Sequence, residues 1–392
     1  MHQVCRKYQG LPWTPPREKG MEANLRSLVN VDVQPNPQPL DPDVLAVAFE
    51  ARAHPKLVRQ MTQESLVLRQ KSLQYACQAM SAPREIACFL EAGIVKSLTD
   101  AGRDEDNEVR ELTTRALARL AREPNGKACL LESDAAIALL LKLGHRENEQ
   151  QEAVRGNCLA AMIELGRDVP CRAALIAAGG VQQLVSTAPG EVEALQPAAL
   201  AALRGMMMAP PGLEQAIAAG AISAMISLLA AAAPAVREQA ALCLGALSVE
   251  AKEKEAARSQ GGLRLLVTLL EREAAPEAGP EGDAVLTAVL ACLASLTADS
   301  PGKMEAVAHE AYKGLLPLLD RAMQLELEGR MSHATCTQTV HLTKCIANVA
   351  EHPKGRKKLQ PALRHLRPLA QSAEPLVAKH AESAVAVVTW KP

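Results

Sequence analysis

The amino-acid sequence predicts an all-α protein in which repeated helical units stack into a solenoid. A turn of small residues recurs along the chain, and its copies at Gly179, Gly220 and Gly261 stand 41 residues apart. Hydrophobic residues make up 48% of the chain but aromatic residues only 2%, so the core must consist of small and aliphatic side chains. Units of this kind cannot bury their apolar surface alone, so each must pack against its neighbours.

The clearest copy of the repeat is the segment 218–250. After the turn at Gly220, apolar residues follow at helical spacing. Pro234 then begins a second helix that is apolar around much of its circumference, with Leu244 as a core position. We expect the equivalent turn positions to be Gly93, Asp134, Gly179, Gly220, Gly261 and Glu310.

These turns resemble those of armadillo repeats, which consist of a short helix followed by two longer ones. The sequences Ala-Gly-Gly-Val at 178–181 and Ala-Gly-Ala-Ile at 219–222 are typical of that family. The resemblance implies an armadillo/HEAT-like right-handed α-solenoid superhelix. Third helices are expected at about 106–122, 149–166, 194–208, 234–249, 282–298 and 332–350, with a helix at 63–80 before them and a partial unit at 361–392.

The chain divides into two parts. Residues 1–43 contain seven prolines, at positions 12, 15, 16, 35, 37, 39 and 42, without a sustained period, which predicts a Pro-rich extended N-terminal arm. The arm is either a flexible tail or a strap that orders on a partner, since Leu11 and Trp13 are apolar. Residues 44–392 form the armadillo-repeat solenoid of about seven to eight units, the terminal ones partial.

Composition restricts the class of protein. A formal net charge of -1 gives no overall bias towards nucleic acid or an anionic membrane. None of the ten cysteines lies in a C-x-x-C pair, which favours buried reduced thiols in an intracellular protein. The first residues lack the apolar region of a signal peptide, and the longest apolar runs are interrupted, so neither secretion by that route nor a membrane span is expected.

Motifs for catalysis are missing from the sequence. His309-Glu310 is followed by Lys313 where a zinc-protease helix requires a second histidine, and there is no P-loop. His333, Cys336, His341 and Cys345 are zinc-binding residue types, but their spacing is unfamiliar and core thiols are the favoured interpretation. We therefore expect no enzyme activity, no metal and no cofactor.

The armadillo resemblance identifies an inner surface for partners, formed by successive third helices. In the nuclear-import members of the family, a Trp and an Asn four residues later recur on this surface and hold a basic peptide. Here no Trp occupies the equivalent positions and only Asn348 matches the Asn. The equivalent pairs, the inner ladder, are Arg115/Arg119, Ala160/Glu164, Ala201/Gly205, Leu242/Ala246, Ala291/Ser295 and Lys344/Asn348.

Within the inner ladder, we expect Arg115, Arg119, Glu164, Leu242, Lys344 and Asn348 to contact a partner. The middle of the ladder is small and apolar, which suits a helix or a folded partner. The alternative is that a solenoid simply tolerates small residues on its inner face.

A basic segment follows the ladder. Between residues 352 and 380 the only acid is Glu374, whereas seven residues are basic: Lys354, Arg356, Lys357, Lys358, Arg364, Arg367 and Lys379. We expect Lys354, Arg356, Lys357 and Lys358 to dock an acidic surface, such as a tubulin wall or an acidic loop; a solvated end is the alternative. No nucleic-acid partner is expected, because no aromatic residue is interleaved to stack on bases.

Four segments carry a more specific resemblance. They are 64–73 (ESLVLRQKSL), 106–114 (DNEVRELTT), 350–359 (AEHPKGRKKL) and 386–392 (AVVTWKP). Over about residues 41–392 the chain is similar to the radial spoke protein 14 family, the axonemal armadillo-repeat proteins of motile cilia. The terminal T-W-K-P is the most specific of these matches, and the arm before Asp41 lies outside the resemblance.

The resemblance implies a non-enzymatic scaffold or adaptor subunit of the ciliary radial spoke, the T-shaped complex that links doublet microtubules to the central pair and helps control dynein. It implies spoke-stalk proteins, inner-arm dynein or doublet-microtubule components as partners in a large hetero-complex, and a location in the axoneme of a cilium or flagellum. The alternative is a cytosolic or nuclear armadillo adaptor that binds peptides in signalling or transport, which the altered inner ladder disfavours.

Overall fold

The computed structural model describes residues 44–45, 52–274 and 279–391, and the arm expected at 1–43 lies outside them. All regular secondary structure in the described residues is helical. The helices are α3 (Ala53–Gln60), α4 (Leu66–Ala79), α5 (Pro83–Glu91), α6 (Ile94–Ala101), α7 (Asn107–Leu120), α8 (Pro124–Leu131), α9 (Asp134–Leu143), α10 (Glu152–Gly166), α11 (Val169–Ala177), α12 (Gly180–Thr187), α13 (Gln196–Met207), α14 (Pro210–Ala218), α15 (Ala221–Leu228), α16 (Pro234–Leu247), α17 (Ala251–Ser259), α18 (Gly262–Glu273), α19 (Gly279–Leu296), α20 (Ser300–Ala308), α21 (Tyr312–Leu327), α22 (His333–Glu351), α23 (Pro353–Lys358), α24 (Leu363–Leu369) and α25 (Pro375–Thr389).

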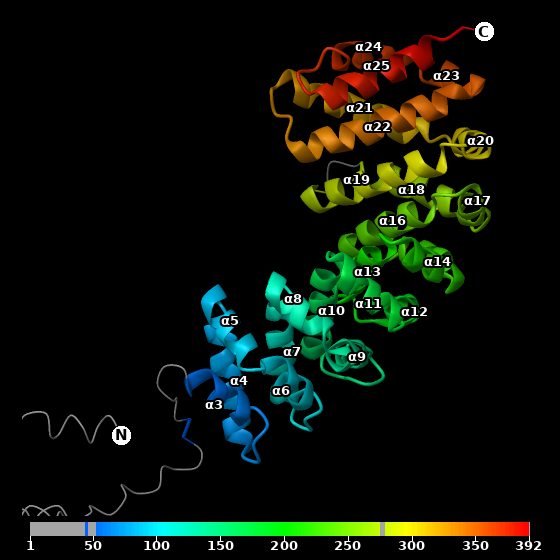
Figure 1. Ribbon diagram of the computed structural model, residues 1–392. Helices are drawn as coiled ribbons and strands as arrows, with labels where there is room; N and C mark the ends of the chain where they lie inside the picture. Colours follow the sequence, from blue (N-terminus) through cyan, green and yellow to red (C-terminus); the bar gives the residue numbers. More distant parts are fainter. Residues whose placement is uncertain (1–43, 46–51, 275–278, 392) are drawn as a thin grey trace, which may run out of the picture. The chain divides into compact units, whose positions relative to one another are not determined.

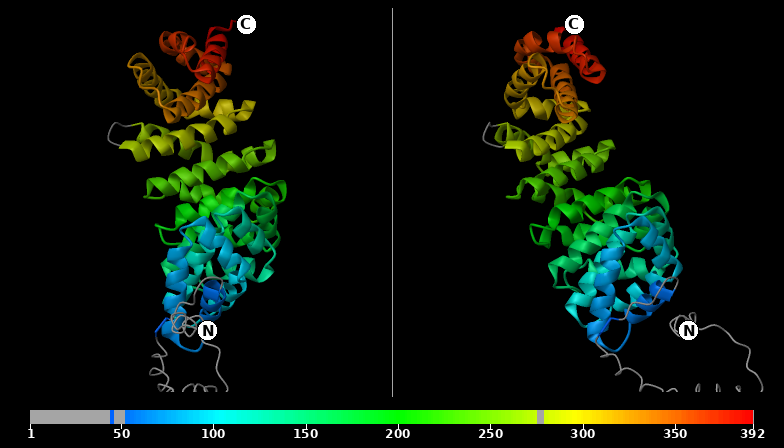
Figure 2. Two further views of the ribbon diagram at one scale, coloured as in Figure 1. Left: turned by 60° about the vertical axis from the view of Figure 1, so that its left-hand side comes forward. Right: turned by 90° about the vertical axis from the view of Figure 1, so that its left-hand side faces the viewer.

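The helices of residues 47–392 repeat in groups of three, as predicted. Each group ends in a long third helix, and these third helices are α7, α10, α13, α16, α19, α22 and α25, preceded by α4. Each of them packs on the third helix of the next group, from α4 against α7 to α22 against α25 (Figure 1). Figure 2 shows the same succession of layers from two other sides. This arrangement confirms the all-α solenoid.

The turn before the second helix is the most regular local feature of the repeat. Gly93, Gly179, Gly220 and Gly261 have φ angles of 77°, 85°, 81° and 80°, and each precedes the first residue of a second helix. Glycine is favoured there because a Cβ atom is strained in the left-handed region. Glu310, at the sixth predicted position, has a φ of 56°.

The predicted equivalence of Asp134 to these glycines is wrong by one residue. Asp134 is the first residue of α9, and Ser133 is its N-cap, with a φ of -114°. The Ser133 hydroxyl accepts a hydrogen bond from the amide of Ala136 at 3.3 Å. Because a side chain caps this helix, the turn does not need a left-handed residue.

The core runs along the stacked helices and consists mainly of Leu, Ile, Val and Ala. Leu244, a predicted core position, is completely buried. Buried thiols link third helices: Cys77 Sγ donates to the carbonyl of Leu112 at 3.3 Å and Cys345 Sγ to that of Leu290 at 3.2 Å. Burial raises the pKa of Cys77 to about 11 and that of Cys345 to about 12, so both stay protonated.

An arginine near the start of a third helix ties two repeats together. Arg155 Nη1 donates to the carbonyls of Glu149 and Gln150 at 2.9 and 2.8 Å, in the loop before its own helix. Its Nη2 lies 2.8 Å from Oε1 of Glu191, in the next repeat, and the two side chains are only 2% and 3% exposed. We call this arrangement an arginine clamp. The other clamps pair Arg69 with Asp104, Arg110 with Glu149 and Arg237 with Glu273, at 2.7, 2.6 and 2.8 Å.

The third helix α13 lacks this clamp. Arg155 stands six residues before Ala161, and the residue six before the equivalent Ala202 is Gln196. Gln196 Nε2 reaches the loop before its helix, donating to the carbonyl of Pro189 at 3.2 Å. Gln196 is uncharged, so no arginine clamp joins α13 to α16 within the described residues.

Candidate functional site

The inner ladder lies on six consecutive third helices that contact one another, from α7 to α22. Each of its positions is accessible to some degree: Arg115 is exposed and the other members are half-buried. The i, i+4 spacing within each pair places both members on one face of their helix. The ladder is therefore a continuous surface that a partner can reach.

Charged side chains occupy the ladder on α7 and α10. Arg115 forms an ion pair with Glu111 on its own helix, and Glu164 Oε2 lies 2.7 Å from Nη1 of Arg167. Both pairs are partly exposed, and such pairs contribute little to stability. These side chains can therefore exchange their present partners for those of a bound protein.

The middle of the ladder is formed by small residues that bring helices close together. Gly166 and Gly205 face each other across α10 and α13, where a Cβ atom built on Gly205 would lie 3.8 Å from the Cα of Gly166. Ser295 Oγ donates to the carbonyl of Ser248 at 2.8 Å. Leu242 is the largest side chain among the middle ladder pairs and stays half-buried.

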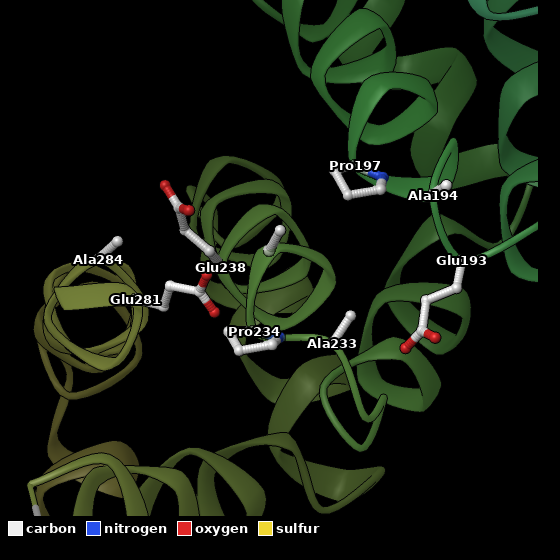
Figure 3. Close-up of a pocket in the computed structure, with 9 residues that line it drawn as sticks. Glu193, Ala194, Pro197, Ala233, Pro234, Glu238, Glu281 and Ala284 are labelled. Carbon is white, nitrogen blue, oxygen red and sulfur yellow. The ribbon is translucent and has the colours of Figure 1, made fainter. Parts of the chain in front are cut away.

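A hollow of about 720 Å³ lies at the beginning of α13, α16 and α19 (Figure 3). Pro197 and Glu238 stand four residues before Ala201 and Leu242, so they share a helix face with the middle of the ladder. Most of its lining is Ala and Pro, with three carboxylates: Glu238 and Glu281 come from neighbouring helices, and Glu193 lies across the hollow from Glu281 (Figure 3). Sequence reasoning did not identify this hollow, because its residues come from three repeats and have no motif.

The C-terminal ladder pair differs in what it can offer a partner. Asn348 Nδ2 donates to the carbonyl of Ala294 and to Oγ1 of Thr297, both at 3.0 Å, so its amide hydrogens are already engaged with α19. Lys344 lies near two imidazoles. Burial, and secondarily the charge of Lys344, lowers the pKa of His341 on α22 and of His380 on α25.

The basic segment is divided by the structure. Arg356 lies inward: its Nε donates to the carbonyl of Ala350 at 3.1 Å and its Nη2 to that of Glu351 at 3.1 Å, which satisfies the end of α22. Its guanidinium carbon also lies 4.6 Å from the ring centre of Trp390. Arg356 is therefore a structural residue as well as a predicted docking residue.

Three other basic residues of this segment lie on the solvent side of α23. Lys354, Lys357 and Lys358 are exposed. Lys358 Nζ lies 5.8 Å from the ring centre of Tyr312. Gly355 is buried against α22, where a Cβ atom would lie 2.1 Å from the carbonyl oxygen of Val349, so α23 is held close to that helix.

Nothing in the described residues assembles a metal site, since no group of three or more His, Cys, Asp or Glu side chains is placed to hold an ion. The four zinc-type residues considered above all lie on α22. In the same part of the chain, no helix has the length and apolar character needed to cross a membrane.

Comparison with known proteins identifies a sequence relative among radial spoke proteins. The chain is 32% identical over 160 residues to radial spoke protein 14 of Chlamydomonas reinhardtii. The match covers 41% of this chain and 40% of that protein, so the chain spans well under half of the curated relative's length. No protein-family model matches.

Solved structures support the fold. A computationally designed armadillo repeat protein for modular peptide recognition has a TM-score of 0.52 and 25% identity, covering 60% of this chain and 98% of the designed one. An engineered protein aligns over 86% of this chain and 99% of its own length, with a TM-score of 0.53 and 18% identity. The predicted armadillo-like solenoid is thereby confirmed.

Proposed function

We propose that this protein is a non-enzymatic scaffold subunit of the radial spoke in cilia and flagella. The observation that carries the proposal is the 32% identity to radial spoke protein 14. The solenoid supports it physically, because stacked repeats provide a long surface on which several neighbours can be held at once. The protein would then act by positioning other components and thereby support ciliary and flagellar motility.

The surfaces proposed for binding are the inner ladder and the exposed lysines of α23. The ladder offers charged side chains on α7 and α10 and small side chains in the middle, which a helix can approach closely. The lysines of α23 favour an acidic neighbour. The proposed partners are spoke-stalk proteins, inner-arm dynein or doublet-microtubule components in the axoneme.

A binding role rather than a reaction is supported by the state of the thiols. Burial raises the pKa of Cys243 to about 12, and the pKa of Cys158 and of Cys292 is raised further. A protonated thiol is a poor nucleophile. The packing of these cysteines inside third helices accounts for their presence without chemistry.

The proposal is tested by tagging the chain in a cell with motile cilia and purifying it from salt-extracted axonemes. We expect radial spoke proteins to co-purify, identified by mass spectrometry. A variant with Arg115→Glu and Arg119→Glu should keep its thermal stability and lose part of this partner set. Recovery with transport or signalling factors, or absence from axonemes, would contradict the spoke assignment.

The second candidate is a peptide-binding adaptor outside the axoneme, favoured by the 25% identity to an armadillo protein designed for peptide recognition. The engagement of Asn348 with α19 argues against the peptide-binding mode of the nuclear-import receptors. The purification described above distinguishes the two candidates, because only the adaptor would be recovered mainly from the soluble cell extract.

A further inference from the structure

Trp390 is a large aromatic side chain that the fold holds in place but does not bury. It is 55% exposed. Its backbone amide donates to the carbonyl of Val387 at 3.3 Å, and the guanidinium of Arg356 lies over its ring. Gln360 Nε2 donates to the carbonyl of Val388 at 2.8 Å and fixes the end of α25. A preorganised, exposed tryptophan is typical of a binding hot spot.

Beside Trp390 is a hollow of about 480 Å³, lined by Glu351, Arg356, Ala386, Val387 and Trp390. Its two charged residues already have partners. Glu351 pairs with Lys303, and Arg356 binds the carbonyls at the end of α22 and the indole ring. The lining left for a ligand is therefore the apolar wall of Ala386, Val387 and Trp390.

Positive charge lies on α23, the helix that places Arg356 over Trp390. Lys354 and Lys357 project from the solvent side of α23, the helix that also carries Arg356. The structure shows no ion pair or hydrogen bond for the ammonium group of either lysine within the described residues. Lys391, directly after Trp390, is exposed as well. A ligand whose apolar group enters the hollow would therefore have its flanking groups close to unneutralised ammonium groups.

We propose that this surface, the Trp390 site, binds a protein segment with one large apolar side chain flanked by acidic residues. The apolar side chain packs against Trp390, and the acidic side chains pair with Lys354 and Lys357. The inference rests on the proposed scaffold function and names the chemistry of one of its partners. In this proposal Arg356 does not bind the partner directly, as the sequence predicts, but positions Trp390.

The experiment uses fluorescence, because the chain has only two tryptophans. In the full chain with Trp13→Phe, emission comes from Trp390 alone. The probe is a peptide of alternating Glu and Gly with one central Leu. We expect saturable binding with a shift of the emission to shorter wavelength, as the indole is removed from water. Peptides with Gly for Leu, or with Lys for Glu, should bind about tenfold more weakly or not at all.

A charge-reversal pair tests the lysines. Lys354→Glu with Lys357→Glu should weaken the Leu-containing peptide about tenfold, because two rim ion pairs are replaced by repulsion. The matched control, Lys252→Glu with Arg264→Glu, makes the same charge change at exposed positions on α17 and α18 and should bind normally. Both variants should melt at the temperature of the parent.

Three results would overturn the proposal. The first is equal affinity for all three peptides. The second is a larger shift of the Trp390 emission with an oligothymidine than with the Leu-containing peptide. The third is an emission shift that depends on protein concentration, occurs without peptide and coincides with dimerisation. Each of these can occur whether or not the chain co-purifies with spoke proteins. Failure of the Trp390 site is therefore distinguishable from failure of the scaffold assignment.

Discussion

The junction between α10 and α13 and the next one, between α13 and α16, have the same helix arrangement but are held differently. The first contains the clamp of Arg155 and Glu191, two nearly inaccessible charges joined at 2.8 Å. The second has Gln196 in place of the arginine and a loop of alanines, including Ala232, where an acid would be required. The hollow with Glu193 and Glu238 opens beside this second junction.

The difference teaches that apolar packing is sufficient to make the solenoid. A buried ion pair contributes little net stability, because desolvation offsets most of its Coulomb attraction, yet removing one partner is costly. The clamps are then best understood as fixing the register of neighbouring repeats. A junction without a clamp keeps the fold and leaves its helix ends open to a partner.

The largest effect is expected from breaking what both junctions share, the apolar core. Leu244→Asp places a carboxylate at a completely buried position of α16 and should destabilise the chain by more than about 4 kcal/mol, measured by urea unfolding. Leu242→Asp, at a half-buried ladder position two residues away, is the control and should cost about 1 kcal/mol or less. Equal costs would show that the two faces of α16 are assigned wrongly.

Next in size is the loss of a clamp. Arg155→Ala leaves Glu191 buried without its partner and should cost about 3 to 5 kcal/mol in urea unfolding. Arg69→Ala should cost less, because Arg69 and Asp104 are 18% and 14% exposed and water can solvate the remaining acid. If the two costs are the same, burial of the clamps does not decide their energetic role.

The sequence predicts the repeat better than it predicts the clamps. The positive φ angle of each turn favours glycine, so a single residue type in the sequence marks the turn. Helical spacing of apolar residues identifies the core around Leu244. The clamp joins two residues about 36 positions apart. From the sequence alone, the side chain of an arginine within a helix, such as Arg155, is expected to be exposed to water. The signal is present, since valine or leucine precedes each clamp arginine, but it becomes meaningful only when repeats are aligned.

The structure shows where the predicted site residues lie, and their binding role stays a prediction. The ladder positions lie on accessible third-helix faces, and the basic segment is exposed at Lys354, Lys357 and Lys358. The contact of Arg356 with Trp390 could not be inferred, although both residues were singled out, because nothing in the sequence places the end of α25 beside α23. The hollow lined by Glu238 could not be inferred either, because it depends on the distance between neighbouring third helices.

A clamp can be introduced at the α13 to α16 junction. Gln196→Arg alone should destabilise the chain, because it buries a charge without a carboxylate. Adding Ala232→Glu, at the spacing of Glu191 from Arg155, should recover about 1 to 2 kcal/mol as a favourable coupling in a double-mutant cycle of urea unfolding. The same pair should close off the nearby hollow. A coupling energy of zero would mean that the α13 to α16 junction has a different geometry from its neighbours.

The smallest effect distinguishes the clamped repeats from α22 and α25 by their pH dependence. Burial opposes ionisation of Glu149, but hydrogen bonds from Arg110 outweigh the effect of burial, and the pKa of Glu149 is lowered. The stability that this clamp contributes is therefore fully present above the unfolded pKa of about 4.3 and is lost as the pH falls through the lower folded pKa. His341 and His380 also have lowered pKa values, but for a base this means that the unfolded chain takes up protons first.

Stability from α22 and α25 should therefore begin to fall as the pH drops below about 6.5, while the clamps are still intact. Hydrogen exchange followed by mass spectrometry at pH 7 and pH 5.5 should show faster opening of α22 and α25 after correction for intrinsic exchange rates, with little change in α7 and α10. The groups facing the two imidazoles are Lys344 and Lys379, so His341→Gln with His380→Gln should remove the effect. Persistence of the difference in that variant would assign it to another group and leave the imidazoles without a role in stability.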